Sequence, residues 1–157
     1  MMIKNVKYFL IILFLSSCGY SPIYEANQKL NFGLDTLTFS GDKKIGREIE
    51  KGLEKFRDSK NKNVFDANFV SLKNKAIVTK DKKGNPSSYK LIIDVKLDLI
   101  NKVNNKSFEK RFIKESTFDS MDNKFELDQY MNNIEKNMIF KILQDINIFF
   151  SVVKNDL

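Results

Sequence analysis

The sequence predicts an α+β domain, a two-layer sandwich of two helices packed on one face of a four-stranded, mostly antiparallel sheet. Three observations predict it. Apolar and polar residues alternate over residues 89–99, a helical apolar stripe follows at 127–149, and a shorter helical stripe precedes both at 45–56. A chain of 157 residues suits one domain better than two, and we place that domain at residues 34–157.

The first elements are a short strand and a helix. β-branched and aromatic residues at 35–39 indicate the strand, which Ser40-Gly41-Asp42 would end. The apolar face of the helix is formed, at spacings of four, four and three, by Ile45, Ile49, Leu53 and Phe56. Asp42 is the expected N-cap, and the polar residues 58–63 indicate a loop after the helix.

Three further strands are expected to form an antiparallel meander. Residues 70–72 and 76–78 indicate parts of one strand, and the turn formers at 82–86 separate it from the next. That next strand is the clearest, because apolar residues at 89, 91, 93, 95, 97 and 99 alternate with Lys90, Asp94, Lys96 and Asp98. A turn at 104–106 would lead into the last strand, around Phe108, Phe112 and Phe118.

The C-terminal segment predicts a long helix that lies across the sheet. Its apolar stripe, at spacings of three and four, consists of Leu127, Met131, Ile134, Met138, Ile142, Ile146 and Phe149. Methionine and phenylalanine in such a stripe indicate core packing rather than a cofactor site.

Composition excludes several classes of chemistry. The chain has no histidine and one cysteine, so Ser-His-Asp and Cys-His catalysis and an intrachain disulfide are impossible. No glycine-rich phosphate loop is present. Asp94 and Asp98 share a strand face with Lys90 and Lys96, which favours solvation and cross-strand pairing over acid–base catalysis. We expect no enzyme activity, no metal and no cofactor.

The N-terminus has the layout of a bacterial signal peptide. Lys4 and Lys7 precede the apolar run 8–15, which is too short to span a bilayer comfortably. Leu15-Ser16-Ser17-Cys18 resembles the lipobox of bacterial lipoproteins, which implies cleavage before Cys18 and covalent N-acyl and S-diacylglycerol lipid on it. We therefore predict a signal peptide at 1–17 and a lipidated tether at 18–33. The alternative is an ordinary signal peptide, or a short anchor, with an incidental cysteine.

Basic residues form the remaining candidate site. The formal net charge of +7 falls to +5 once residues 1–17, with two lysines and no acid, are removed. Export argues against nucleic acid, so anionic lipid or sugar phosphate is the favoured partner. The candidates, expected together at one end of the sheet, are Lys80, Lys82, Lys83, Lys110, Arg111 and Lys114. Arg111 is the best suited to hold a phosphate because its guanidinium is bidentate. The alternative is a solvated, lysine-rich surface.

Residues 18–24, Cys-Gly-Tyr-Ser-Pro-Ile-Tyr, resemble the start of mature members of the LptE family of lipopolysaccharide-assembly lipoproteins. Ile23 stands where the family usually has leucine. The predicted element order also resembles that family's fold of two helices on a four-stranded sheet. Gly19, where aspartate would signal retention in the inner membrane, is compatible with outer-membrane sorting.

The resemblance implies a non-enzymatic lipoprotein on the periplasmic side of the outer membrane. Such a protein plugs the LptD β-barrel and binds lipopolysaccharide, with basic residues at one end of the sheet near the lipid A phosphates. Two other hypotheses stay open. One is a free lipid-anchored periplasmic binding module for a lipid, glycan or protein; the other, a lipoprotein hydrolase, is disfavoured by the missing histidine.

Overall fold

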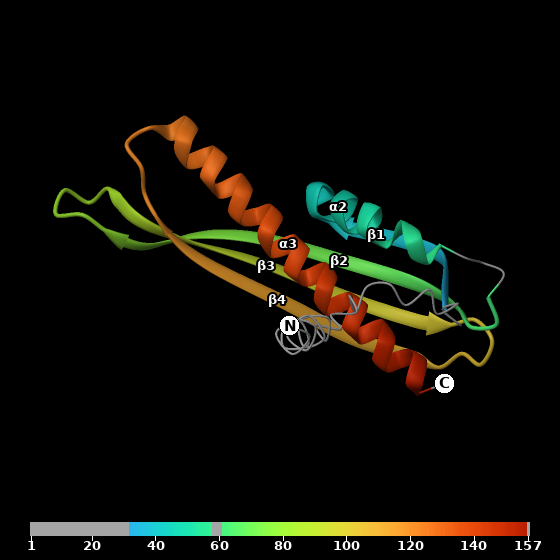
Figure 1. Ribbon diagram of the computed structural model, residues 1–157. Helices are drawn as coiled ribbons and strands as arrows, with labels where there is room; N and C mark the ends of the chain where they lie inside the picture. Colours follow the sequence, from blue (N-terminus) through green and yellow to red (C-terminus); the bar gives the residue numbers. More distant parts are fainter. Residues whose placement is uncertain (1–31, 58–60, 157) are drawn as a thin grey trace, which may run out of the picture. The chain divides into compact units, whose positions relative to one another are not determined.

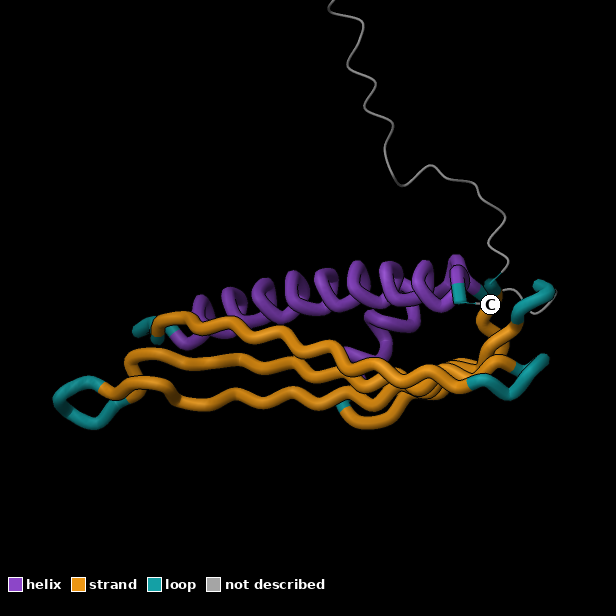
Figure 2. Tube along the Cα trace, turned by 90° about the horizontal axis from the view of Figure 1, so that it is seen from below, coloured by secondary structure: helices purple, strands orange, loops and turns teal. Residues whose placement is uncertain are grey.

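A computed structural model of the protein describes residues 32–57 and 61–156. Its elements are β1 (Gly33–Gly41), α2 (Lys43–Leu53), a 3₁₀ turn η2 (Glu54–Phe56), β2 (Val64–Lys80), β3 (Pro86–Asn101), β4 (Ser107–Asp119) and α3 (Lys124–Asn155). The strands form one sheet in the order β1-β2-β3-β4. Strand β1 is parallel to β2, and the other two pairs are antiparallel. Both helices lie on the same side of the sheet (Figures 1 and 2). The predicted α+β sandwich is confirmed.

The core lies between the helices and the covered face of the sheet. Strand β3 contributes every second residue to it, and all five are at most 1% exposed: Leu91, Ile93, Val95, Leu97 and Leu99. A strand places alternate side chains on opposite faces, so this row is what the alternation in the sequence predicts. The strand before it is one continuous element, whereas the sequence indicated two pieces of it, at 70–72 and 76–78.

Helix α2 begins where the sequence predicts. The Asp42 carboxylate accepts hydrogen bonds from the backbone N–H groups of Lys44 and Ile45, at 2.9 and 3.1 Å, as an N-cap does. Ile45 and Ile49 are fully buried, because their spacing of four puts both on the face turned to the sheet.

Helix α3 is longer than predicted and buries a slightly different stripe. The helix continues to Asn155, and Phe150 and Val153 are buried at its end, while Phe149 is only partly buried. The stripe from Ile142 and Ile146 continues at a spacing of four and then three. A spacing of three or four satisfies helical periodicity equally well, so the sequence could not decide between positions 149 and 150.

The packed domain begins before Leu34. Phe32 is 2% exposed, and its ring lies 4.7 Å from the rings of both Phe65 and Phe150. Gly33 opens β1. The structure thus places in the domain two residues that we assigned to the tether.

Candidate functional site

Cys18, the predicted lipidation site, lies outside the described residues, as do the signal peptide and most of the predicted tether. The structure therefore bears on the domain and its basic side chains. None of the helices in residues 32–57 and 61–156 combines the length and apolar content that a membrane span requires. Within the same ranges no group of three potential metal ligands comes together.

Three of the predicted basic residues lie together at the turn between β2 and β3. Lys80 ends β2, and Lys82 and Lys83 lie in the turn itself. The turn is held by Asp81, whose carboxylate accepts hydrogen bonds from the backbone N–H groups of Lys83 and Asn85, both at 2.8 Å. These bonds, that of Asn85 foremost, keep the pKa of Asp81 below its ordinary value. The one acid of the turn is thus engaged locally, and no described acid forms an ion pair with the three lysines.

The other three predicted residues do not join this group, so the expectation of one cluster is wrong. Register places Asp119 opposite Ser88, beside the turn, whereas Arg111 lies opposite Lys96. Asp119 and Arg111 are eight residues apart on β4, and eight residues of extended strand span about 27 Å. The candidates on β4 therefore lie at mid-strand, because they come too early in it to reach the turn.

Two of those three side chains are engaged in ion pairs. The Arg111 guanidinium donates a bidentate hydrogen bond to Asp94, from Nε at 2.8 Å and from a terminal nitrogen. That hydrogen bond holds the pKa of Asp94 below its usual value and raises the pKa of Arg111. Lys114 pairs with Asp145 of α3 at 2.7 Å. Arg111 and Lys114 thus join elements of the domain.

Ion pairs cover much of the sheet face opposite the helices. They join Lys102 to Asp35 and Asp66, Lys96 to Asp98 and Glu109, Lys90 to Glu115, and Arg111 to Asp94. Asp94 has a basic partner on the neighbouring strand, Arg111, as the sequence favoured, whereas the basic partner of Asp98 is Lys96 of the same strand. The charges on this face are therefore largely paired, and the exposed apolar side chains of Leu72, Ile100 and Ile113 lie among them.

An ionic cluster around the buried Glu135 joins α3 to β2 and to the start of α2. Glu135 is 2% exposed and lies 3.4 Å from Lys73 Nζ and 3.2 Å from Lys44 Nζ. Lys73 also lies 3.4 Å from the Asp42 carboxylate. Sequence reasoning missed this cluster. The available signal was that Glu135 follows Met131 by four residues and precedes Met138 by three, which puts it on the buried side of the helix.

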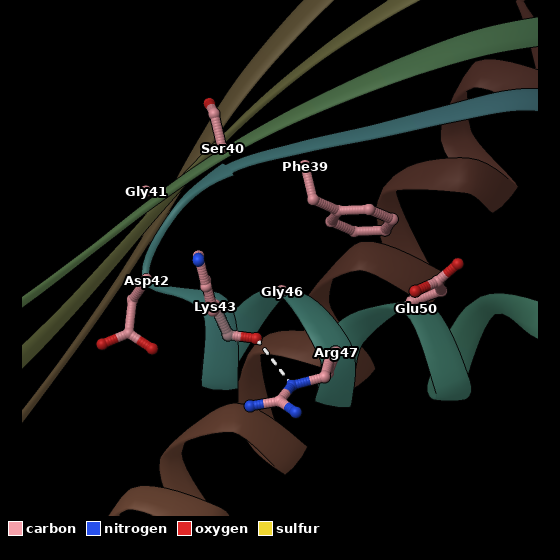
Figure 3. Close-up of a pocket in the computed structure, with 8 residues that line it drawn as sticks. All are labelled: Phe39, Ser40, Gly41, Asp42, Lys43, Gly46, Arg47 and Glu50. Atoms are coloured by element: carbon pink, nitrogen blue, oxygen red, sulfur yellow. Dashed lines mark hydrogen bonds between the residues drawn. The ribbon is translucent and has the colours of Figure 1, made fainter.

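A groove of about 350 Å³ runs beside the end of β1 and the first turns of α2 (Figure 3). It is lined by Phe39, Ser40, Gly41, Asp42, Lys43, Gly46, Arg47 and Glu50. Three of its four charged side chains, those of Asp42, Arg47 and Glu50, already have partners within the domain. Asp42 caps α2, Arg47 Nε donates to the Lys43 carbonyl at 3.2 Å, and Glu50 lies 3.5 Å from Arg57. The groove therefore offers no convergent set of uncommitted charges.

Solved structures of bacterial lipoproteins resemble this domain. Rare lipoprotein B from Shewanella oneidensis has a TM-score of 0.64 at 13% identity, covering 79% of this chain and 98% of that one. The domain shares its fold. A minor lipoprotein from Acinetobacter baumannii has a TM-score of 0.59 at 8% identity, covering 78% and 93% of the two chains. Lipoprotein B from Nitrosomonas europaea, described as uncharacterized, has a TM-score of 0.54 at 16% identity, covering 76% and 85%. Neither a scan against protein-family models nor a search of curated proteins by sequence finds a match.

Proposed function

We propose that this protein is an outer-membrane lipoprotein of the LptE type, which plugs an LptD-type β-barrel and takes part in lipopolysaccharide transport. The observation that carries the proposal is the shared fold with rare lipoprotein B, which is LptE, over 98% of that chain. The resemblance of residues 18–24 to the start of mature LptE supports it independently. In this proposal Cys18 carries the lipid, and the domain works on the periplasmic side of the outer membrane without catalysing a reaction.

The uncovered face of the sheet is suited to a polar barrel interior. Barrels with a filled lumen present polar side chains inward. The ion pairs on this face, among them Lys96 with Asp98 and Glu109, already neutralise one another. A surface of that kind can contact a polar wall without burying an unpaired charge, which would be costly.

We place lipopolysaccharide binding at Lys80, Lys82 and Lys83. Phosphate groups require cations that are not already paired, and lysine binds them as a point charge. These three lysines lie in or next to one turn and have no ion-pair partner among the described residues, in contrast to Arg111 and Lys114. The turn therefore concentrates positive charge at the end of the hairpin.

The test of the assembly is extraction of the full-length lipoprotein from the envelope in mild detergent, followed by size analysis and mass spectrometry. We expect co-elution with a large outer-membrane barrel and radiolabelled palmitate on the protein. Cys18→Ala is expected to abolish the label and leave the folded domain intact. A monomer of its own size, without a barrel, would support the free binding module instead.

Lipopolysaccharide binding is tested on the purified protein with the double variant Lys82→Glu/Lys83→Glu. The reversal replaces two attractive charges by two repulsive ones, so we expect affinity to fall at least tenfold. The matched control is Lys136→Glu/Lys141→Glu, which makes the same charge change on exposed positions of α3. Equal losses in both doubles would show that net charge, and not the turn, governs binding.

A further inference from the structure

Strand β2 continues well beyond the strand that flanks it. β1 ends at Gly41, opposite Ser71, and the last backbone hydrogen bond between them runs from the Asp42 N–H to the Ser71 carbonyl at 2.9 Å. Figure 1 shows β2 continuing past that point to the hairpin turn. Among the described residues, no strand lies beside residues 72–80 on the side of β2 that β1 has left. We call this side of residues 72–80 the free edge.

The free edge presents regular backbone hydrogen-bonding groups. Because the Ser71 carbonyl points towards β1, the peptide groups two residues apart along the strand point the same way. Those are the groups of Lys73, Lys75 and Ile77, and the pairing with β3 is regular up to Ile77 opposite Tyr89. An extended row of unpaired N–H and C=O groups is a template for another strand.

The side chains along this edge indicate the chemistry of the partner. Five lysines stand against one aspartate over residues 72–85: Lys73, Lys75, Lys80, Lys82, Lys83 and Asp81. The aspartate is engaged in its turn, and Lys73 is paired with Glu135, so the positive excess lies on the other four lysines. Leu72, Ile77 and Val78 are 49–60% exposed, so apolar contacts are available between the cations.

We propose that the free edge of residues 72–80 binds an extended, acidic segment of another polypeptide as an additional strand. Main-chain hydrogen bonds provide the affinity in this mode of recognition, and the flanking side chains provide the selectivity. Carboxylates on the incoming strand would meet the lysines of β2 and of the turn. The inference does not depend on the barrel or on lipopolysaccharide.

Two other occupants fit less well. A second copy of the chain would set the lysines of one edge against those of the other, and like charges across a strand pair are destabilising. Residues 18–31 of the same chain contain one acid, Glu25, and one base, Lys29, so they offer no net negative charge. The lysines thus disfavour self-association and favour an acidic partner.

The test uses the full-length protein in detergent micelles and a nine-residue peptide that alternates glutamate and valine. Amide hydrogen exchange, followed by NMR, should show at least tenfold slower exchange at Lys73, Lys75 and Ile77 on adding the peptide. The amides of Leu72, Asn74 and Ala76 point towards β3 and should be protected already. A peptide with lysine in place of glutamate should bind at least tenfold more weakly.

Backbone pairing is separated from simple charge attraction in two ways. Lys75→Pro removes an outward N–H, which an edge strand tolerates, and should weaken peptide binding at least tenfold. Its control, Lys75→Ala, keeps the N–H and should lose no more than about threefold. A glutamate–valine peptide N-methylated at alternate amides leaves the protein unchanged and should bind at least tenfold more weakly, whatever the stability of the proline variant.

Three results would overturn the proposal: no added protection of the three amides, equal binding of the N-methylated peptide, or protection of these amides before any peptide is added. The last would show that the chain's own N-terminal segment or a second copy occupies the edge. Lipopolysaccharide is added in a separate experiment, because its phosphates can bind the turn lysines without protecting the edge amides. The two experiments therefore distinguish a lack of strand pairing at the free edge from a lack of lipopolysaccharide binding.

Discussion

The two halves of β2 share one backbone geometry and differ in everything around it. From Phe65 to Ser71 alternate residues are buried under the helices, with β1 alongside. From Leu72 to Lys80 every residue is exposed, including three large apolar ones. The change falls at Ser71, where β1 ends. Covering elements, and not strand formation alone, thus decide which half contributes to the core and which half is available to a partner.

The largest expected effect compares one apolar side chain from each half. Phe69 is 1% exposed and its ring lies 5.1 Å from that of Phe39. Phe69→Ala leaves a cavity and should lower the free energy of unfolding by about 3–5 kcal/mol. Ile77→Ala, at a site 49% exposed, should change it by about 0.5 kcal/mol or less. Urea unfolding of both variants is the measurement. Similar losses of unfolding free energy in the two variants would contradict the conclusion that only the first half of β2 contributes to the core.

The next effect concerns the boundary itself, where β1 leaves the sheet at Gly41. Its φ is +89°, and a Cβ there would lie 1.9 Å from the Ser71 carbonyl oxygen. Gly41→Ala should therefore cost on the order of 2–4 kcal/mol, from backbone strain and the clash together. Gly84 in the hairpin turn has nearly the same φ, +86°, with no atom within 4 Å. Gly84→Ala should cost only about 1 kcal/mol.

Thermal unfolding of the two glycine variants gives the difference directly. Both glycines have a positive φ, so the backbone strain caused by alanine is similar at the two positions. The extra destabilisation of Gly41→Ala over Gly84→Ala therefore measures the clash with Ser71. Equal destabilisation would mean that close contact at the boundary contributes nothing.

The smallest effect is a dependence on pH at the same boundary. Burial opposes ionisation of Asp42, but hydrogen bonds from Ile45 and Lys44 and the charge of Lys73 together hold its pKa below 3.8. A carboxyl whose pKa is lower in the folded than in the unfolded state stabilises the fold above about pH 4. That stabilisation is lost as the pH falls through the folded value.

Asp42→Asn tests this dependence because asparagine is also a good N-cap but carries no charge. We expect the variant to be about 0.5–1 kcal/mol less stable at pH 7, with the difference shrinking as the pH falls through the lowered pKa of Asp42. Urea midpoints between pH 7 and pH 2.5 provide the measurement. Asp119→Asn, at the end of β4, is the control for loss of an exposed carboxylate. A difference that persists unchanged at low pH would exclude ionisation of Asp42 as its source.

Most of the fold could be predicted because each element carries its own local signal. The alternation at 89–99, the stripe at 45–56 and the cap at Asp42 depend on residues close in sequence. The parallel direction of β1 against β2 had no such signal, since it depends on how the chain crosses over through α2. The inclusion of Phe32 was also missed, because its partners, Phe65 and Phe150, are distant in sequence.

The candidate site was predicted only in part, for the same reason. Lys80, Lys82 and Lys83 share a turn, and turns are recognisable from local residues. The placement of Arg111 and Lys114 depends on the register of β4 and on α3, which supply the partners Asp94 and Asp145. A count of charges along the chain cannot separate lysines that bind a ligand from those that join two elements.

Strand β3 holds the hairpin formed by β2 and β3 in one backbone conformation, which a loop of equal length would not have. It pairs with β2 almost to the turn, from Asn101 to Pro86, and on its other side it pairs with β4 from Ile100 to Ser88. The free edge therefore has a fixed backbone before any partner arrives. Ordering a flexible residue costs about 1–2 kcal/mol in conformational entropy, and here only the incoming segment would lose that freedom.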